Sequence, residues 1–404
     1  MPGSASFRRT VEAHRDAVRA LLAPLHERTH ESVPLEDALN RVTSHAVTSP
    51  VALPLFRNSQ MDGIAVRAAE AAAATAEAPV LLPLVGEVAA APGEPAPLVP
   101  GTAVRIMTGA PVPAGADAVA RVEDTEDRGT EVAILVAPTP GLYVRQAGSD
   151  LAAGAELVPA GCRLRSRHLA ALAAAGLTHV DVQTSVRVAI ISTGSELVAP
   201  GAEAGPGELF DANGPALASA ARSVGAEVVL SGRVRDEAEE FAALLDVARE
   251  AGAELIVTSG GVSMGEHEVV REVLEPRGAL VGSVAMQPGG PQGTAEWEGI
   301  PVLCFPGNPV SSQLSFELFV APVLREIAAL PEAVHGREPL AHALDSIAGK
   351  RQYLRGARGD GGVATVSGPG SHLVAALAAA ELLIVVPEHV THLEPGDIVE
   401  TVEL

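Results

Sequence analysis

The chain has 404 residues, and 50 Asp and Glu residues outnumber 28 Lys and Arg residues, which gives a formal net charge of −22. This length favours two or more domains. Apolar residues make up 47% of the chain, enough for buried cores, although aromatic residues contribute only 2%. The acidic balance argues against a general nucleic-acid binder, because binding to phosphates needs a basic face. Lys350 is the only lysine, so the other basic residues are arginines.

The two cysteines, Cys162 and Cys304, lie far apart in the sequence. They lack the spacing of a disulfide framework or a thiolate zinc site. The N-terminal segment is charged from Arg8 onward, unlike a signal peptide. The apolar run near the C-terminus is interrupted by Glu381, well short of the ~20 residues that span a bilayer. We therefore expect a soluble protein of the reducing cytoplasm with no direct membrane insertion.

The N-terminal part of the chain predicts helices at both ends of a β-rich region. Apolar spacing indicates an amphipathic helix over 7–23, ended by Pro24, and short helices over 34–39 and 167–175. From about 50 to 140, Pro and Gly recur every few residues, and helical spacing is confined to the alanine-rich patch 68–78. Short β-prone runs between them predict a small β-domain with tight turns. These runs are 81–85, 103–107, 118–122 and 132–136.

From residue 186 onward, predicted strands and helices alternate. The continuous apolar run 186–192 is typical of a buried strand, and the helix predicted over 236–250 places Phe241, Leu245 and Ala248 on one face. The other predicted strands are 227–231, 255–258, 279–285 and 302–305, and the other helices are 216–224, 268–274 and 310–329. This order predicts a doubly wound, mostly parallel sheet, which binds ligands beyond the carboxyl ends of its strands. The short β-prone runs and turn residues after Pro331 predict a separate C-terminal β-domain that ends in a strand at 398–402.

Two glycine-containing turns follow strands of the α/β region, at 192–196 and 258–265. Backbone N–H groups and hydroxyls at such turns can surround an anion, and glycine lets a ligand approach the main chain. An ordinary turn is the alternative for either segment, and neither matches a Walker A or dinucleotide-binding motif.

Several polar residues near predicted helix starts have both a structural and a functional interpretation. Asn308, in the proline-rich segment 305–311, can cap a helix or contact a ligand. Asp236 and Glu239 form a capping-box pattern, and Asp211 and Asn213 also precede a helix. The histidines lack metal-binding spacing, and no Ser-His-Asp or Cys-His motif is present.

Seven ordered segments together resemble one family. They are FRNSQMDGIAVR (56–67), AVRIMTGAPVPAGADAV (103–119), RQAGSDLAAG (145–154), STGSEL (192–197), TSGGVSMGE (258–266), FPGNPVSS (305–312) and GPGSH (368–372). Their order and spacing are similar to those of molybdopterin molybdenumtransferases, the bacterial relatives of the gephyrin C-terminal domain. The resemblance covers nearly the whole chain.

This resemblance implies four subdomains and an elongated homodimer. The expected linking subdomain comprises 1–49 and 141–182, the small β-subdomain 50–140, the α/β molybdopterin-binding subdomain 183–330, and the C-terminal β-subdomain 331–404. Members of the family insert molybdate into adenylylated molybdopterin, release AMP and require Mg²⁺. Their cleft lies between the α/β subdomain of one protomer and the N-terminal β-region of the other.

Motif matching carries the family's site onto this chain. Asp62, Asp150, Asp236 and Glu268 are the expected catalytic carboxylates, with Asp236 and Glu268 also as magnesium ligands and Asp62 supplied by the neighbouring protomer. The expected substrate-binding residues are Thr108, Arg145, Thr193, Gly194, Glu196, Ser259, Gly260, Gly261, Ser263, Pro306, Asn308, Pro309, Arg355 and Ser371. Pro306 and Pro309 are expected to shape the pterin pocket.

The chain departs from the family where lysines are expected. Gln287 and Gly290 stand in the family's Lys-Pro-Gly-Lys-Pro run, and an upstream lysine is absent at about Ser283. Glu268 replaces an aspartate. Losing these cations weakens anion binding by about 1 kcal/mol each where the charges are partly desolvated. This motivates a second hypothesis, a gephyrin-like scaffold that binds a short peptide of a membrane receptor or of a cytoskeletal or cell-division protein.

Overall fold

The computed structural model describes residues 6–262 and 268–404 and groups the chain into two compact units. The first unit combines the N-terminal segment up to Glu31 with 40–42 and 183–404. The second combines 32–39 with 43–182. Within the described residues, no helix is long and apolar enough to cross a membrane.

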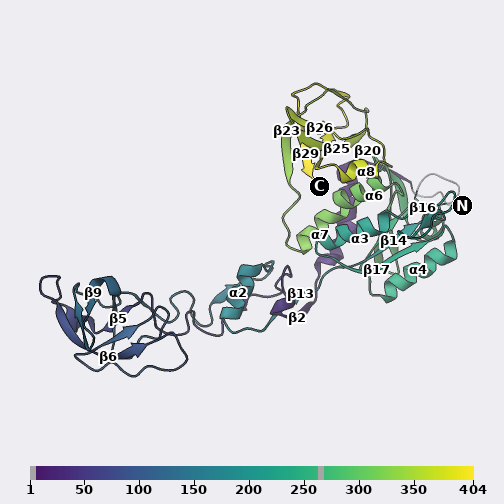
Figure 1. The fold of residues 1–404 in the computed structure, drawn as a ribbon. Coiled ribbons are helices and arrows are strands. Elements are labelled where there is room, and N and C mark those ends of the chain that lie inside the picture. The colour runs from purple at the N-terminus through teal and green to yellow at the C-terminus, as the bar shows by residue number, and fades with distance from the viewer. Residues whose placement is uncertain (1–5, 263–267) are drawn as a thin grey trace. The chain divides into compact units, whose positions relative to one another are not determined.

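A seven-stranded sheet forms the centre of the first unit (Figure 1). In spatial order its strands are β1 (Phe7–Arg9), β19 (Leu280–Val284), β21 (Pro291–Trp297), β22 (Ile300–Phe305), β18 (Leu255–Ser259), β14 (Arg187–Thr193) and β17 (Glu227–Val234). Only β21 runs antiparallel to its neighbours. The prediction of a doubly wound, mostly parallel sheet is confirmed.

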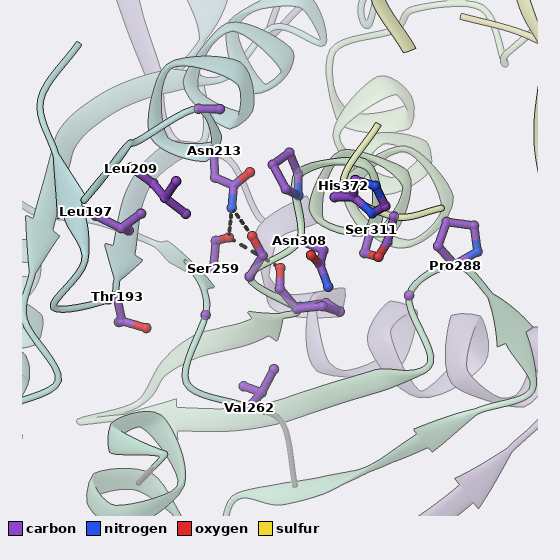
Figure 2. A pocket seen from close by; sticks show the side chains of 18 of the residues that line it. Thr193, Leu197, Leu209, Asn213, Ser259, Val262, Pro288, Asn308, Ser311 and His372 are labelled. Atoms are coloured by element: carbon purple, nitrogen blue, oxygen red, sulfur yellow. Dashed lines mark hydrogen bonds between the residues drawn. The ribbon is translucent and has the colours of Figure 1, made fainter. Parts of the chain in front are cut away.

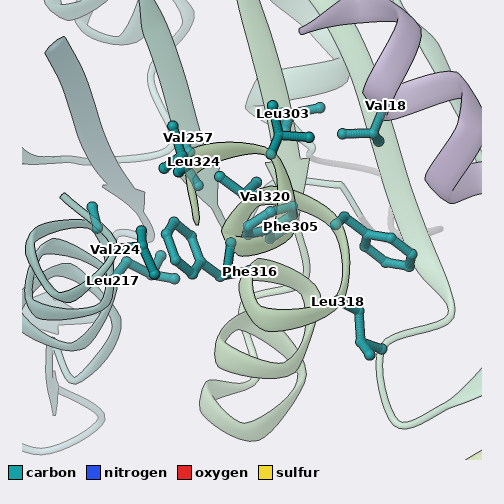
Figure 3. Packing of buried hydrophobic residues seen from close by; sticks show 14 of the residues in the cluster. Val18, Leu217, Val224, Val257, Leu303, Phe305, Phe316, Leu318, Val320 and Leu324 are labelled. Atoms are coloured by element: carbon teal, nitrogen blue, oxygen red, sulfur yellow. The ribbon is translucent and has the colours of Figure 1, made fainter. Parts of the chain in front are cut away.

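Helices cover both faces of this sheet, because its central strands are apolar on both sides. In β14, Val188 and Ile190 pack into one buried cluster, while Ala189 and Ile191 pack into another. The first cluster is closed by α1 (Val11–Leu21), α3 (Asn213–Ser223), α6 (Pro309–Ser315), the π-helical turn Phe316–Val320 and α7 (Ala321–Ile327). The second is closed by α4 (Ala238–Glu250) and α5 (Val269–Leu274). Figure 3 shows Phe316 packed against Leu217 and Val224 of the α3 segment in the first cluster.

In the first unit, one predicted boundary is wrong and one strand was not predicted. Residues 7–9 form β1 rather than the start of the first helix, because Phe7 pairs with Gly282, where a missing side chain leaves room for the aromatic ring. The Thr10 side chain then caps α1. Strand β21 was not predicted, since its Pro291, Gln292 and Gly293 are residues typical of turns.

A six-stranded sheet forms the main core of the second unit. Its order is β8 (Ala118–Arg121), β5 (Gly63–Val66), β7 (Ala103–Ile106), β6 (Val80–Val88), β10 (Glu131–Ile134) and β9 (Thr125–Asp127). The predicted β-prone runs therefore form strands. The alanine-rich patch gives only a 3₁₀ turn, Ala68–Ala71. The helix predicted over 167–175 is α2 (Ser166–Ala174), and the one over 34–39 shortens to the 3₁₀ turn Leu35–Asp37.

Two-stranded pairs complete the connections in both units. They are β2 (His30–Pro34) with β13 (His179–Gln183), β3 (Val47–Thr48) with β12 (Glu156–Val158), β4 (Asn58–Ser59) with β11 (Val144–Arg145), β15 (Leu197–Val198) with β16 (Leu209–Phe210), and β24 (Leu344–Asp345) with β28 (His392–Leu393).

The C-terminal residues form a second sheet in the first unit, as the β-texture predicts. Its strands are β20 (Met286–Gln287), β25 (Arg351–Gly359), β27 (Leu382–Val386), β29 (Ile398–Glu403) and β23 (His335–Pro339), with β26 (Gly362–Thr365) paired to β25. A short helix that was not predicted, α8 (Val374–Ala378), follows the GPGSH segment. The four-subdomain division stays a prediction. In the structure, α1 packs in the core of the α/β sheet.

Candidate functional site

A cleft of about 1120 Å³ lies in the first unit at the carboxyl ends of three parallel strands. Thr193 ends β14, Ser259 ends β18, and Pro306 directly follows β22. The loop from Pro369 to His372, between β26 and α8, also lines the cleft, and Figure 2 shows its His372. The cleft therefore lies where a doubly wound sheet is expected to bind its ligand.

A buried polar cluster joins three of the segments that line this cleft. The amide nitrogen of Asn213 donates to Ser259 Oγ and to the Gly307 carbonyl oxygen, both at 2.7 Å. Ser312 Oγ donates to the same Ser259 hydroxyl at 3.1 Å. Figure 2 shows Asn213 and Ser259 facing each other at the cleft wall. These hydrogen bonds hold the strand-end turns in one arrangement.

Asp211 fixes the start of α3, on which Asn213 lies. Its Oδ1 accepts hydrogen bonds from the backbone N–H groups of Asn213 and Gly214 and from Ser192 Oγ, all at 3.0 Å. The prediction that Asp211 caps a helix therefore agrees with the structure. Asn213 instead occupies the first helical position and uses its side chain in the cleft wall.

The two predicted glycine turns meet each other at the cleft. A Cβ atom on Gly260 would lie 2.4 Å from the Thr193 carbonyl oxygen and 2.7 Å from its hydroxyl, and Gly260 has a φ of +102°. Gly194, Gly260 and Gly261 all line the cleft. Glycine is required at 260 because the two strand ends approach too closely for any side chain.

Asp236 bridges the ends of β14 and β17 and does not cap a helix. Its Oδ2 accepts from the Ser195 N–H at 3.0 Å, and its own N–H donates to Ser195 Oγ at 3.1 Å. Helix α4 starts at Ala238 after Glu237, with no side-chain cap, so the capping-box prediction is wrong. The reciprocal pair orients the Asp236 carboxylate, and Asp236 and Glu196 both line the cleft.

The proline-rich segment 305–311 carries the cleft wall into α6. Asn308 precedes α6 without a side-chain capping bond, so its predicted capping role is wrong, and its side chain lies in the cleft (Figure 2). The Val310 N–H donates to the Ser371 carbonyl oxygen at 3.1 Å. This bond holds the GPGSH segment over the start of α6.

Arg355 lies behind this segment and does not line the cleft. Its guanidinium is 1% exposed and donates to the Ser367 hydroxyl and the Gly368 carbonyl oxygen. Burial lowers the pKa of this guanidinium. Arg355 therefore supports the chain that leads to Ser371.

The cleft lining carries an excess of negative charge. Among the described residues that line it are Glu196, Asp211, Asp236 and Glu268, with no Arg or Lys. Gln287, at a predicted lysine position, lines the cleft and its Oε1 accepts from Gln352 Nε2 at 2.5 Å. Gly290 has open space, since an added Cβ would meet nothing closer than 3.6 Å. The end of the cleft where the lysines are missing is neutral.

The remaining predicted site residues belong to the second unit, where their segments converge. Asp62 Oδ1 accepts from the Thr108 N–H at 2.6 Å and from its hydroxyl at 2.8 Å. Arg145 pairs with Asn58 across β11 and β4, and the Asp150 N–H donates to the Leu53 carbonyl oxygen at 2.9 Å. Three of the seven sequence motifs therefore meet within this unit.

The hydrogen bonds from Thr108 lower the pKa of the exposed Asp62 carboxyl, the backbone N–H contributing most. Asp62 is thus held in its charged form.

Asp236 and Glu268, the two predicted magnesium ligands, both line the cleft. Within residues 6–262 and 268–404, no three His, Cys, Asp or Glu side chains form a group able to hold a metal ion on their own. Ser263, a predicted substrate-binding residue, lies outside the described residues.

Sequence reasoning missed several residues that line the cleft. Leu197 and Leu209 pair across β15 and β16 and form an apolar wall, and Ser311 and His372 lie across the cleft from them in Figure 2. Leu209 is 62% exposed, and this exposure of a large apolar side chain is visible only in the structure and not in the sequence. The pair Asp211 and Asn213 had a sequence signal, a polar pair between a strand-end turn and a helix.

Fold and site together define a multidomain protein whose α/β domain has its cleft beyond the carboxyl ends of parallel strands. Three family models match the chain in order: the MoeA N-terminal region (domains I and II) over residues 9–176, a probable molybdopterin-binding domain over 189–326, and the MoeA C-terminal region (domain IV) over 337–404.

Individual relatives match over nearly full length. Molybdopterin molybdenumtransferase 2 of Mycobacterium tuberculosis is 40% identical over 399 residues, which cover 96% of this chain and 98% of the relative. Molybdopterin molybdenumtransferase of a Nostoc species is 38% identical over 77% of this chain and 71% of the relative. A crystal structure of a molybdopterin biosynthesis MoeA protein from Pyrococcus horikosii superposes with a TM-score of 0.83 and 33% identity, over 98% of this chain and 99% of that chain.

The chain therefore belongs to the MoeA family.

Proposed function

We propose that this protein is a molybdopterin molybdenumtransferase that acts in molybdenum cofactor biosynthesis. It inserts molybdate into adenylylated molybdopterin and releases AMP. The observation that carries this proposal is the match of all three MoeA regions in order, together with full-length relatives at 40% identity that bear the enzyme's name.

The cleft has the chemistry that such a substrate needs. Leu197 and Leu209 provide an apolar wall for a flat heterocycle, and the turns at Thr193–Gly194 and Ser259–Gly261 provide backbone N–H groups and hydroxyls for phosphate oxygens. Pro306 and Pro309 stiffen the wall between these turns and the GPGSH segment. The arrangement is already formed before the substrate binds, so binding costs little conformational entropy of the protein.

A magnesium ion fits this cleft as a partner of the substrate rather than as a resident metal. Mg²⁺ is usually held by one or two carboxylates together with substrate phosphates and water. Asp236 and Glu268 are the carboxylates we propose for this role. When bound, the ion supplies positive charge that polarises the phosphoanhydride. The Ser195–Asp236 pair orients one of these carboxylates from the protein side.

The second unit contributes a separate group of polar residues to the proposal. Asp62, Thr108, Arg145 and Asp150 form one region of that unit, and we propose that they complete the cleft of a neighbouring protomer in a homodimer. A sedimentation mass equal to one 41.1 kDa chain contradicts the dimer. We place the reaction in the cytoplasm, in keeping with two free cysteines.

The scaffold hypothesis is not retained. The neutral end of the cleft at Gln287 favoured it, but relatives at 37–40% identity are named as the enzyme. A binding role for a receptor or cell-division peptide has no observation of its own in this chain.

The direct test is to incubate the purified protein with adenylylated molybdopterin, molybdate and Mg²⁺. We expect AMP release that depends on molybdate, and a product that activates a molybdenum enzyme lacking its cofactor. Asp236→Asn is expected to lower the rate strongly, and Asp360→Asn, at an exposed position in the turn between β25 and β26, serves as the matched control. AMP release no faster than without protein contradicts the proposal.

A further inference from the structure

The charge of the cleft poses a problem for an anionic ligand. Among the described residues, four carboxylates line it: Glu196 and Asp236 after the ends of β14 and β17, Asp211 before α3, and Glu268 before α5. Both molybdate and a phosphate ester are oxyanions, and carboxylates repel them. Among the described residues that line the cleft, His372 is the only side chain that can carry a positive charge.

His372 is held in position by the main chain around it. The Val310 N–H donates to the Ser371 carbonyl oxygen at 3.1 Å, and the Val374 N–H donates to the His372 carbonyl oxygen at 3.0 Å. The imidazole also packs over Gly370, since a Cβ there would lie 3.1 Å from His372 Cε1. The ring is exposed and therefore accessible to a ligand.

The surroundings of His372 are polar but uncharged. Figure 2 shows it near Ser311 and Asn308, on the side of the cleft opposite to Leu197 and Leu209. Pro288 lies on the same side in Figure 2, and Gln287, which directly precedes it in the chain, also lines the cleft. Hydroxyl and amide groups donate to an oxyanion without adding negative charge, so this end of the cleft suits an oxyanion better than the carboxylate end.

We infer that the imidazole of His372 is the group that this chain sets against the oxyanion of its substrate. This inference rests on the proposed function and names a residue on the side of the cleft where the family's lysines are missing. An imidazole N–H donates a hydrogen bond to an oxyanion, and a protonated imidazole adds a positive charge.

The test measures binding of molybdate alone and of inorganic phosphate alone by calorimetry at pH 6. His372→Gln keeps a hydrogen-bond donor without charge, His372→Lys supplies a permanent positive charge, and His389→Gln is an exposed control in the same C-terminal part. We expect His372→Gln to weaken binding about tenfold, His372→Lys to retain it, and His389→Gln to leave it unchanged.

The two probes distinguish the source of the oxyanion. Loss of molybdate binding alone assigns His372 to the metal oxyanion, and loss of both assigns it to tetrahedral oxyanions in general, the phosphate of the pterin included. If His372→Gln binds both probes as tightly as the unchanged protein, or if neither probe binds the unchanged protein, the inference is overturned.

Turnover separates this inference from the proposed function. We expect His372→Gln to raise KM for molybdate at pH 6 while kcat is largely kept. An active enzyme whose KM for molybdate ignores this substitution overturns the role of His372 and leaves the function standing. A protein that binds oxyanions through His372 but never releases AMP overturns the function and leaves the site standing.

Discussion

Asp62 and Thr108, 46 positions apart in the sequence, are joined by two hydrogen bonds to one carboxylate oxygen. The Thr108 N–H and hydroxyl both donate to Asp62 Oδ1, although the two residues are exposed. The pair links the motifs at 56–67 and 103–119 and fixes the orientation of the Asp62 carboxylate. Its effect on the carboxyl can be measured directly.

We expect the carboxyl of Asp62 to titrate below the ordinary range of aspartate. Its pKa is lowered mainly by the backbone N–H of Thr108 and then by the Thr108 hydroxyl. Thr108→Val removes only the second bond, so the pKa should rise part of the way toward its usual value, while Thr108→Ser should leave it unchanged. Carbon NMR of the carboxyl measures both. An identical titration in Thr108→Val and Thr108→Ser contradicts this relationship.

The sign of the effect on stability follows from the lowered pKa. Above the unfolded-state pKa of about 4, the charged carboxylate stabilises the second unit. This contribution is lost as the pH falls through the lower folded-state pKa, so Thr108→Val and the unchanged protein should converge in acid. Urea unfolding of both between pH 2 and pH 6 measures the difference.

His14 makes the first unit sensitive to acid at a higher pH. It is 1% exposed, stacks on Phe7 and meets Phe319 edge-on. Burial, together with nearby Arg9, lowers the pKa of His14 to about 4. In the unfolded chain, His14 binds a proton near pH 6.5, whereas in the folded chain it does so only near pH 4. Stability is therefore full above about pH 6.5 and is lost as the pH falls toward 4.

Replacing His14 by Phe should remove this part of the acid sensitivity. We expect the unfolding free energy of the unchanged protein to fall by about 2 kcal/mol more than that of His14→Phe between pH 7 and pH 4.5. Urea unfolding of the first unit measures it, with His389→Phe, an exposed position, as the control. Parallel losses in all three proteins would mean that His14 is not the group responsible.

Gly260→Ala tests the close contact between the two strand-end turns. The new Cβ would lie 2.4 Å from the Thr193 carbonyl oxygen, which is backbone and cannot rotate away, and φ is +102°. We expect a loss of about 1–3 kcal/mol of stability and a higher KM for the pterin substrate, since both turns line the cleft. Gly359→Ala is the control, because a Cβ there meets nothing within 4 Å. Equal thermal unfolding temperatures for the two variants would refute the contact.

The strands of both units were predictable because each one is a short run of branched apolar residues between turn residues. Continuous apolar runs such as 186–192 and 255–258 predict buried strands whatever the rest of the chain contains. The failures have a different cause. Phe7 is part of a strand only because Gly282, far along the chain, leaves room for it, and β21 is a strand because β19 and β22 flank it. Such tertiary pairings leave no local pattern.

The site was predictable in parts for the same reason. The glycine turns at 194 and 260 follow strands, so their position at one sheet edge follows from the topology. Asp236 has a local capping pattern, yet its carboxylate bonds to Ser195, 41 positions away. Arg355 carries a family role in the sequence but lies buried behind the segment with Ser371. Local chemistry cannot distinguish a residue that lines a cleft from one that supports its wall.

Gly290→Lys tests whether the neutral end of the cleft limits oxyanion binding. Gly290 lies between Gly289 and Pro291, which both line the cleft, and an added Cβ there has room, with the Val284 carbonyl oxygen 3.6 Å away. A lysine side chain brings a permanent cation to a cleft that is lined by carboxylates. We expect molybdate to bind about fivefold to tenfold more tightly, and KM for molybdate to fall accordingly.

Gly290→Gln adds a side chain of similar length without charge and should leave molybdate binding near that of the unchanged protein. The gain from Gly290→Lys should shrink as salt is raised, because a charge near solvent is screened. Equal affinities for the Lys and Gln variants at low salt would mean that the cations for the oxyanion come from outside this end of the cleft.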